Sequence, residues 1–318
     1  MDQQNNIAIS MPDQWDWSIR LLGNLDISEA TKDEYVARIK FFIAFVQSHG
    51  FNRNSYLEYK RYLTKRTDLS ISTKNKYLIV ARVYCRELHR QGYIPIDITL
   101  NIKSFQQTRK HKRDGFTEAE VQRILGCVQE NNSSDAYRIK ALLSLLILQG
   151  LRQVEIVRLN VTEIDIVSQI AFVQGKGKDD TEAIDLHPTT VMALKEYMRQ
   201  YKVADGPLFT STSNNCSHGH RLTTRSIRNI IYPILLELGI DRTVHGFRHF
   251  FTTKLIQSYK GDLLTVAQYT RHKSLEMLQV YNDSIKKNSD LPKYYETFSD
   301  INFTENKGST DHNYNYQK

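Results

Sequence analysis

The sequence has few cysteines, and their spacing is uninformative as a metal or disulfide pattern. Cys85, Cys127 and Cys216 are the three cysteines in 318 residues, and no two of them form a C-x-x-C pair. An odd number of scattered cysteines predicts neither a disulfide framework nor a zinc site. We therefore expect no metal and a reducing compartment such as the cytoplasm.

Long hydrophobic runs and a phosphate-binding loop are also lacking. The longest apolar run near the middle, residues 141–148, contains a serine and is far too short to span a bilayer. The N-terminal residues 1–17 show no charged-then-apolar signal pattern. No G-x-x-x-x-G-K-[ST] motif occurs, so nothing indicates a nucleotide cofactor. We expect no membrane partner and no cofactor.

Acidic residues are outnumbered by basic ones. The chain has 43 Lys and Arg against 35 Asp and Glu, a formal charge of +8. This surplus favours a polyanionic partner, usually nucleic acid, although a basic protein without such a partner has the same composition. The length and the hydrophobic fraction of 40% predict about two globular domains.

The first half of the chain has the periodicity of a small helical domain. A capping box at residues 31–34 predicts a helix that ends at Gly50, and a second helix is expected from Ser55. Ser72 or Thr73 is expected to cap a third helix that ends before residue 92. Its basic residues, and those of the linker that follows, are DNA-contact candidates; solvated charge is the alternative. These candidates are Lys74, Lys76, Arg82, Arg86, Arg109, Lys110, Lys112 and Arg113.

The second half is expected to be mainly helical with one β-hairpin. A capping box at residues 117–120 and a buried helix over 135–148 open it. Strands are expected at 170–173 and 181–186, around a glycine turn. Later helices are expected at 189–201, 224–238, 245–258, 262–270 and 274–281. The predicted organisation is an N-terminal segment (1–22), a helical domain (23–101), a basic linker (102–115), a second domain (116–300) and a disordered tail (301–318).

Six residues occur in an order that suits attack on a phosphodiester: Arg152, Lys176, His245, Arg248, His272 and Tyr281. Such attack adds negative charge to the non-bridging oxygens, and a guanidinium binds two of these oxygens at once, so we place Arg152 and Arg248 there. A tyrosine nucleophile, Tyr281, would need a proton acceptor or a cationic neighbour, because its pKa is ordinarily about 10. A histidine can supply either, and a lysine on a turn can protonate the leaving oxygen.

The motifs that contain these residues resemble those of tyrosine recombinases of the lambda-integrase type, the family that includes the Xer and Cre recombinases. The resemblance covers roughly residues 20–295. It is carried by Gly150-Leu151-Arg152 with Glu155, Gly175-Lys176-Gly177, His245-x-x-Arg248, and His272 nine residues before Tyr281. Within this resemblance, Lys176 is preferred over Lys178 on the same turn. His249 and His187 match no catalytic position and are expected to be structural.

The resemblance implies a mainly α fold with a small β-hairpin or sheet, arranged as a two-domain C-shaped clamp around duplex DNA. The clamp would consist of a helical core-binding domain and a catalytic domain. All six catalytic positions are filled, which implies an active enzyme. Glu155 is expected to support the active-site arginine, with a surface charge as the alternative.

The same resemblance implies a reaction and partners. Tyr281 would form a 3′-phosphotyrosyl bond while Arg152, Arg248 and His272 hold the phosphate. His245 would handle the tyrosine proton, and Lys176 would protonate the leaving oxygen. A homo-tetramer would pair two DNA sites and exchange strands through a four-way junction, with accessory proteins possible.

One motif departs from the family pattern. The family has Leu-Gly-His where this chain has Thr270-Arg271-His272, so an arginine stands in place of the usual glycine. We expect a bacterial, phage or mobile-element recombinase of the simple two-domain type, because only about 20 to 25 residues precede the first helical domain. A type IB topoisomerase-like enzyme and a non-catalytic DNA-binding regulator remain the alternatives.

Overall fold

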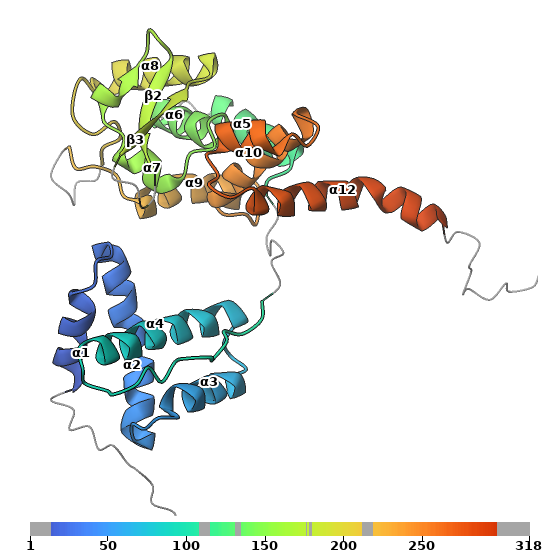
Figure 1. Ribbon diagram of the computed structural model, residues 1–318. Coiled ribbons are helices and arrows are strands. Elements are labelled where there is room, and N and C mark those ends of the chain that lie inside the picture. Colours follow the sequence, from blue (N-terminus) through green and yellow to red (C-terminus); the bar gives the residue numbers. More distant parts are fainter. Residues whose placement is uncertain are drawn as a thin grey trace, which may run out of the picture. The chain divides into compact units, whose positions relative to one another are not determined.

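The chain divides into two compact units, which are described separately. The structure is a computed structural model that describes residues 14–107, 115–130, 135–175, 177, 180–211 and 219–297. The first unit spans Met1–Arg109 and the second Lys110–Lys318 (Figure 1). Among the described helices, none is both long enough and apolar enough to cross a bilayer.

The first unit is a helical bundle built around aromatic side chains. Its helices are α1 (Gln14–Gly23), α2 (Glu29–His49), α3 (Ser55–Lys65) and α4 (Ile71–Arg90). Phe42 of α2 lies edge-on to Tyr59 of α3 and to Tyr84 of α4, with ring centroids 5.0 and 6.2 Å apart. All three rings are almost fully buried, so the bundle has a true core.

Two helix starts lie earlier in the chain than predicted. Helix α2 has Ser28 as its N-cap rather than Thr31, and α4 has Ser70 rather than Ser72 or Thr73. The side chain of Ser70 accepts a hydrogen bond from the backbone N–H of Thr73 at 3.2 Å. Threonines suited to capping thus lie inside the first turn in both helices, because a serine three residues earlier takes the cap.

The first bundle also begins earlier than expected. Leu21 and Leu22 of α1 are buried in its core, and Ser18 Oγ lies 3.0 Å from Tyr84 Oη. Residues that we expected to precede the helical domain therefore contribute to its packing.

The second unit contains helices α5 to α12 and a small antiparallel sheet. The helices are α5 (Glu118–Glu130), α6 (Ala136–Ile147), α7 (Gln153–Arg158), α8 (Pro188–Tyr201), α9 (Thr224–Glu237), α10 (His245–Ser258), α11 (Leu263–Thr270) and α12 (Leu275–Thr297). The strands β1 (Ile164–Asp165), β2 (Ile170–Gln174) and β3 (Thr181–Asp185) pair in the order β1-β2-β3. The predicted hairpin is present, with Phe172 opposite Ala183, and β1 was not predicted.

Helix α6 lies at the centre of the second unit. It packs against α5, α7, α8, α9 and α10, and its side chains are buried on nearly every side (Figure 1). The predicted capping box of α5 is present: Thr117 N donates to Glu120 Oε2 and Glu120 N to Thr117 Oγ1. Together with the small sheet, these helices confirm the prediction of a mainly α protein.

Helix α12 is much longer than the predicted helix over residues 274–281. Its first turns pack on α10 and α11, where Leu278 and Tyr281 join Ile256 and Val266 in a small apolar cluster. The remainder runs out from the second unit as a continuous helix to Thr297 (Figure 1). Tyr281 therefore lies in the middle of a helix and not at its end.

Candidate active site

Arg152 stands at the N-cap of α7, directly after the Gly150-Leu151 turn. Its backbone N–H donates to Glu155 Oε2 at 2.8 Å, and its Nη1 donates to Glu155 Oε1 at 2.8 Å. Glu155 is the third residue of α7, so its carboxylate reaches back to the backbone N–H of the N-cap residue as in one half of a capping box, while the Arg152 side chain donates to the same carboxylate. The side chain of Arg152 remains about one-third exposed (32%) and can reach a ligand.

Glu155 is buried and lies between two arginines. Its side chain is only 1% exposed, and its Oε2 also accepts a hydrogen bond from Arg271 Nη2 at 2.8 Å. Burial alone would raise the pKa of this carboxyl, but Arg271 and Arg152 lower it below its usual value. The carboxylate is therefore charged and fixes both guanidinium groups, which is more than a surface charge would do.

Arg271 forms the turn at the end of α11, at the position where the family motif has glycine. It caps the end of α11 with φ of 54° and ψ of 43°, in the left-handed region. The backbone N–H of His272 donates to Ala267 O at 3.3 Å, which closes the helix end. A residue other than glycine pays about 1–2 kcal/mol for this conformation. The ion pair with buried Glu155 offsets this cost, so the arginine does not disrupt the junction.

Arg248 of α10 joins the turns that carry Arg152 and His272. Its Nη1 donates to Gly150 O at 2.7 Å and its Nη2 to Thr270 O at 2.5 Å. The side chain is buried, and burial together with Arg152 lowers its pKa to about 10. It is still protonated at neutral pH, so a second fixed cation lies near Arg152.

His272 is oriented by the same turn. Its Nδ1 lies 2.7 Å from Thr270 Oγ1, while Thr270 Oγ1 donates to Val266 O at 2.8 Å. The hydroxyl hydrogen is thus used by Val266, so the imidazole Nδ1 acts as the donor to Thr270. Burial, Arg248 and Arg152 lower the pKa of His272 to about 4. His272 is therefore neutral at physiological pH.

Tyr281 is paired with a histidine that sequence reasoning assigned to a structural role. Its Oη lies 2.6 Å from Nδ1 of His249 on α10, and the two rings are 5.3 Å apart. The tyrosine is 9% exposed. Burial raises its pKa to about 12, against the opposing effect of Arg248. Such a phenol needs a base in contact before it can act as a nucleophile, and His249 is in contact.

His245, to which the sequence assigned the tyrosine proton, lies beside His249. It is exposed at the first turn of α10, and its ring packs edge-on to His249 at 4.9 Å. The assignment of the tyrosine proton to His245 stays a prediction, and the hydrogen bond of His249 makes that residue a second candidate. The signal for His249 was available: it lies four residues after His245, hence on the same face of a helix. The packing of α12 on α10 brings His249 to the tyrosine.

A cleft of about 350 Å³ lies over the arginine turn. The cleft is lined by Arg152, Glu155, Arg271 and His272, by Lys273 and Ser274 of the turn before α12, by Met277 in the first turn of α12, and by residues of the hairpin. Gly175, at the edge of the hairpin turn, is among them and accepts a hydrogen bond from Arg158 Nη1 at 3.1 Å. Lys176 and Lys178 fall outside the described residues, so the preference between them stays a prediction.

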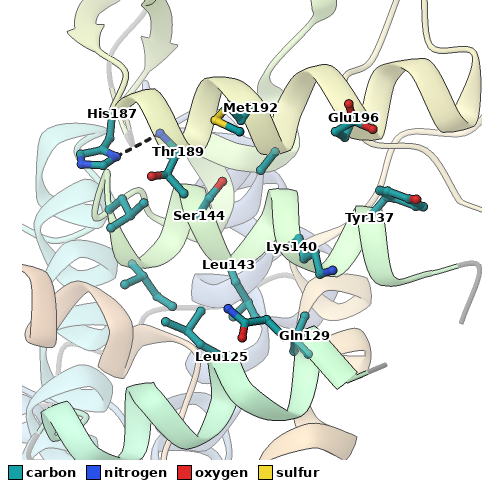
Figure 2. A pocket seen from close by; sticks show the side chains of 14 residues that line it. Leu125, Gln129, Tyr137, Lys140, Leu143, Ser144, His187, Thr189, Met192 and Glu196 are labelled. Carbon is teal, nitrogen blue, oxygen red and sulfur yellow. Dashed lines mark hydrogen bonds between the residues drawn. The ribbon is translucent and has the colours of Figure 1, made fainter. Parts of the chain in front are cut away.

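A second, apolar pocket of about 490 Å³ lies elsewhere in the same unit (Figure 2). Its walls come from α5, α6 and the start of α8, with Leu125 and Leu143 among its apolar residues. His187 lies at its edge, where Nδ1 accepts a hydrogen bond from Thr189 N at 3.1 Å and caps α8. Neither Arg152 nor Tyr281 lines this pocket, so it is separate from the arginine cleft.

Two of the DNA-contact candidates of α4, Lys74 and Arg82, make hydrogen bonds within the first unit. Lys74 is buried, and its Nζ donates to Thr64 O at 3.1 Å, so the prediction of an exposed phosphate contact is wrong for this residue. Arg82 Nη2 donates to Ile102 O at 2.5 Å inside the same unit. Arg86 is 58% exposed beside Asp97, and Lys76 is exposed. The linker candidates Arg109, Lys110, Lys112 and Arg113 fall outside the described residues.

Metal ligands are not assembled in the described part of the chain. No group of three or more His, Cys, Asp or Glu side chains there is arranged to hold a metal ion. The chemistry of the described site is that of arginines, histidines and one tyrosine.

The second unit thus combines a cleft lined by Arg152 and Arg271 with a buried tyrosine, in a mainly helical fold with a small sheet. The model of the phage integrase family matches residues 115–288, which is more than half of the chain. The chain therefore belongs to the phage integrase family, which confirms the resemblance to tyrosine recombinases and the enzyme class, a tyrosine site-specific recombinase.

Individual relatives support the same grouping. The chain is 27% identical over 277 residues to tyrosine recombinase XerD of Oceanobacillus iheyensis, covering 82% of this chain and 89% of the relative. Among solved structures, the XerH site-specific recombinase bound to a palindromic difH substrate matches with a TM-score of 0.69 at 20% identity, covering 84% and 80% of the two chains. The Tn1549 transposon integrase in complex with transposon right end DNA matches at 0.64 and 14% identity, covering 88% and 98%. These two likenesses support the fold.

Proposed function

We propose that this protein cleaves and rejoins DNA strands at a specific site through a phosphotyrosyl intermediate. The observation that carries the proposal is the pairing of Tyr281 with His249 next to a cleft lined by Arg152 and His272. The XerH and Tn1549 structures are described as DNA complexes, which supports duplex DNA as the partner.

Attack by Tyr281 replaces one phosphoester bond with another. The Tyr281 oxygen forms a bond to phosphorus, its proton passes to His249, and the bond from phosphorus to the 5′-oxygen breaks. Lys176 gives that oxygen a proton, which leaves a 3′-phosphotyrosyl link and a free 5′-hydroxyl. Arg152 and Arg248 neutralise the charge that develops on the non-bridging oxygens. His272 donates to the phosphate from Nε2 as the imidazolium, because its Nδ1–H is already used by Thr270 and an anionic phosphate favours the protonated ring. The new ester retains the energy of the old one, so rejoining is the same reaction in reverse.

The assembly follows from the need to exchange strands between two sites. We propose a homo-tetramer on two paired DNA sites, in which cleaved strands cross through a four-way junction. Integration, excision, or the resolution of a plasmid or replicon dimer would each use this reaction, with accessory proteins where the element requires them. Relaxation of supercoiled plasmid by a monomer, without paired sites, would instead indicate a topoisomerase-like enzyme.

Covalent capture tests the proposal. The protein is incubated with nicked duplexes taken from the DNA that flanks its gene, and a denaturing gel reveals any protein bonded to DNA. The wild type should form an adduct, and Tyr281→Phe should form none, because that change removes the attacking oxygen but keeps the ring in its apolar cluster. Tyr197→Phe is the matched control: Tyr197 is fully buried in the same unit, away from the cleft. An adduct formed by Tyr281→Phe would overturn the nucleophile assignment.

A further inference from the structure

Arg271 has features that the proposed reaction leaves unexplained. The side chain is 5% exposed and lines the cleft that also contains Arg152 and His272. It occupies a left-handed backbone position, which arginine adopts only when other contacts stabilise it. Its Nη1 is buried and has no hydrogen-bond partner among the described residues. A buried cation in a strained backbone conformation, with one donor atom unpaired among the described residues, needs a structural or functional explanation.

The contacts of Arg271 lead to Arg152 through one carboxylate. Arg271 Nη2 and the backbone N–H of Arg152 both donate to Oε2 of Glu155, each at 2.8 Å, and Arg152 Nη1 donates to Oε1 at 2.8 Å. Without Arg271, Glu155 would keep contacts on only one side. Because Glu155 is 1% exposed and paired on both sides, loss of one arginine leaves a buried carboxylate with fewer donors.

We infer that Arg271 is a positioning residue: it holds the Glu155 carboxylate so that Glu155 aims Arg152 into the cleft. Arg271, Glu155 and Arg152 are called the arginine clamp below. The inference rests on the proposed function for its activity readout, but the geometry of the clamp can be tested without it. It also explains how the turn before His272 keeps its form with arginine in place of glycine.

The expected effect falls on the chemical step. In single-turnover reactions at saturating protein, Arg271→Ala should slow adduct formation by about 10- to 100-fold, the range seen when the outer partner of a functional side chain is removed. Affinity for the DNA, measured by fluorescence anisotropy, should change by less than about threefold, because the side chain is only 5% exposed. Arg271→Lys should restore part of the rate, since its ammonium can still reach Glu155.

A double-mutant cycle separates positioning from direct phosphate contact. If Arg271 acts through Arg152, then Arg152→Ala with Arg271→Ala should be no slower than Arg152→Ala alone. Losses that multiply would show that Arg271 contacts the phosphate on its own, and would overturn the inference. An unchanged rate in Arg271→Ala would overturn it as well.

A matched variant at Arg138 controls for a loss of rate that is caused only by destabilisation of the fold. Arg138 is also 5% exposed and forms an ion pair with Asp135 at 2.8 Å, but on α6, outside the cleft. Arg138→Ala should lower the melting temperature and leave the adduct rate of the folded protein unchanged. Arg271→Gly, which removes the side chain and relieves the left-handed backbone, should fold well and still be slow.

A crystal structure tests the geometry of the arginine clamp independently of DNA cleavage. A crystal structure of Arg271→Gly should show the Arg152 side chain displaced from Glu155. If Arg152 Nη1 still lies against Oε1 as in the wild type, the inference fails whatever the activity. If instead wild type forms no adduct while the clamp behaves as described, the proposed function fails and the positioning role stands.

Discussion

The hydroxyl of Tyr281 on α12 lies 2.6 Å from Nδ1 of His249 on α10. The two residues are 32 positions apart in sequence, and the contact exists because the first turns of α12 pack on α10. It places an imidazole against a phenol whose pKa is raised by burial to about 12. In the tautomer with its hydrogen on Nε2, His249 is a proton acceptor for the tyrosine at hydrogen-bond distance before any substrate arrives.

Removal of the His249 side chain should slow DNA cleavage more than removal of the His245 side chain. We expect His249→Ala to slow adduct formation by roughly 100- to 10,000-fold, the range for a general base. His245→Ala should cost less, because the hydrogen bond to the Tyr281 hydroxyl at 2.6 Å is made by His249. The measurement is the single-turnover adduct rate of both variants between pH 6 and 9. A silent His249→Ala combined with a damaging His245→Ala would restore the assignment made from sequence.

The neutral state of His272 should appear in the pH dependence of stability. Its folded pKa is about 4, below the ordinary value of about 6.5. As pH falls from about 6.5 towards 4, the unfolded chain binds a proton that the folded protein does not, so unfolding becomes more favourable. Above about pH 6.5, His272 does not contribute to the pH dependence of the free energy of unfolding. In His272→Gln, the free energy of unfolding should fall less between pH 6.5 and 4.5 than in wild type, and identical slopes would contradict the assignment.

Gly150 should tolerate no side chain. A Cβ there would lie 2.2 Å from Cδ1 of Phe251, and its φ of +57° is in the left-handed region. Gly239 has a similar φ of +65° with nothing within 4 Å of a Cβ, so it isolates the backbone cost. Both alanine variants should lose about 1 kcal/mol of unfolding free energy from the backbone. Gly150→Ala should lose about 1–3 kcal/mol more from overpacking.

Urea unfolding monitored by circular dichroism measures both glycine variants. Gly150→Ala should also reduce adduct formation, because Gly150 O holds Arg248 Nη1 at 2.7 Å. Equal losses of stability in the two variants would show that Phe251 moves aside at no cost.

Two buried tyrosines of the first bundle should respond oppositely to loss of the hydroxyl. Tyr56 Oη donates to Leu78 O at 3.0 Å, whereas Tyr59 Oη is buried with no hydrogen-bond partner among the described residues. Tyr56→Phe should cost about 1 kcal/mol of unfolding free energy. Tyr59→Phe should be neutral or stabilising, since it removes a buried hydroxyl that makes no hydrogen bond. The same urea experiment compares them, and a larger loss in Tyr59→Phe would show that its hydroxyl has a partner.

Local signals in the sequence determined most of the helices. Apolar periodicity and turn residues placed the starts of α3 and α5, and both ends of α6 and of the hairpin strands, within a residue or two. The starts of α2 and α4 were misplaced because Ser28 and Ser70 compete with nearby threonines for the cap. Helix α12 was predicted to end near residue 281 but continues to Thr297 with Pro292 inside it, and a proline within a helical pattern ordinarily marks a helix end.

The identity of the catalytic candidates was also determined by sequence, since the motif spacing that named Arg152, Arg248, His272 and Tyr281 is local and countable. Which histidine contacts Tyr281, and what stabilises an arginine at residue 271, were decided only by tertiary structure. His249 meets Tyr281, and Arg271 meets Glu155, across elements that are 32 and 116 residues apart. Such contacts depend on how helices pack, and packing is a property of the whole unit that no local pattern encodes.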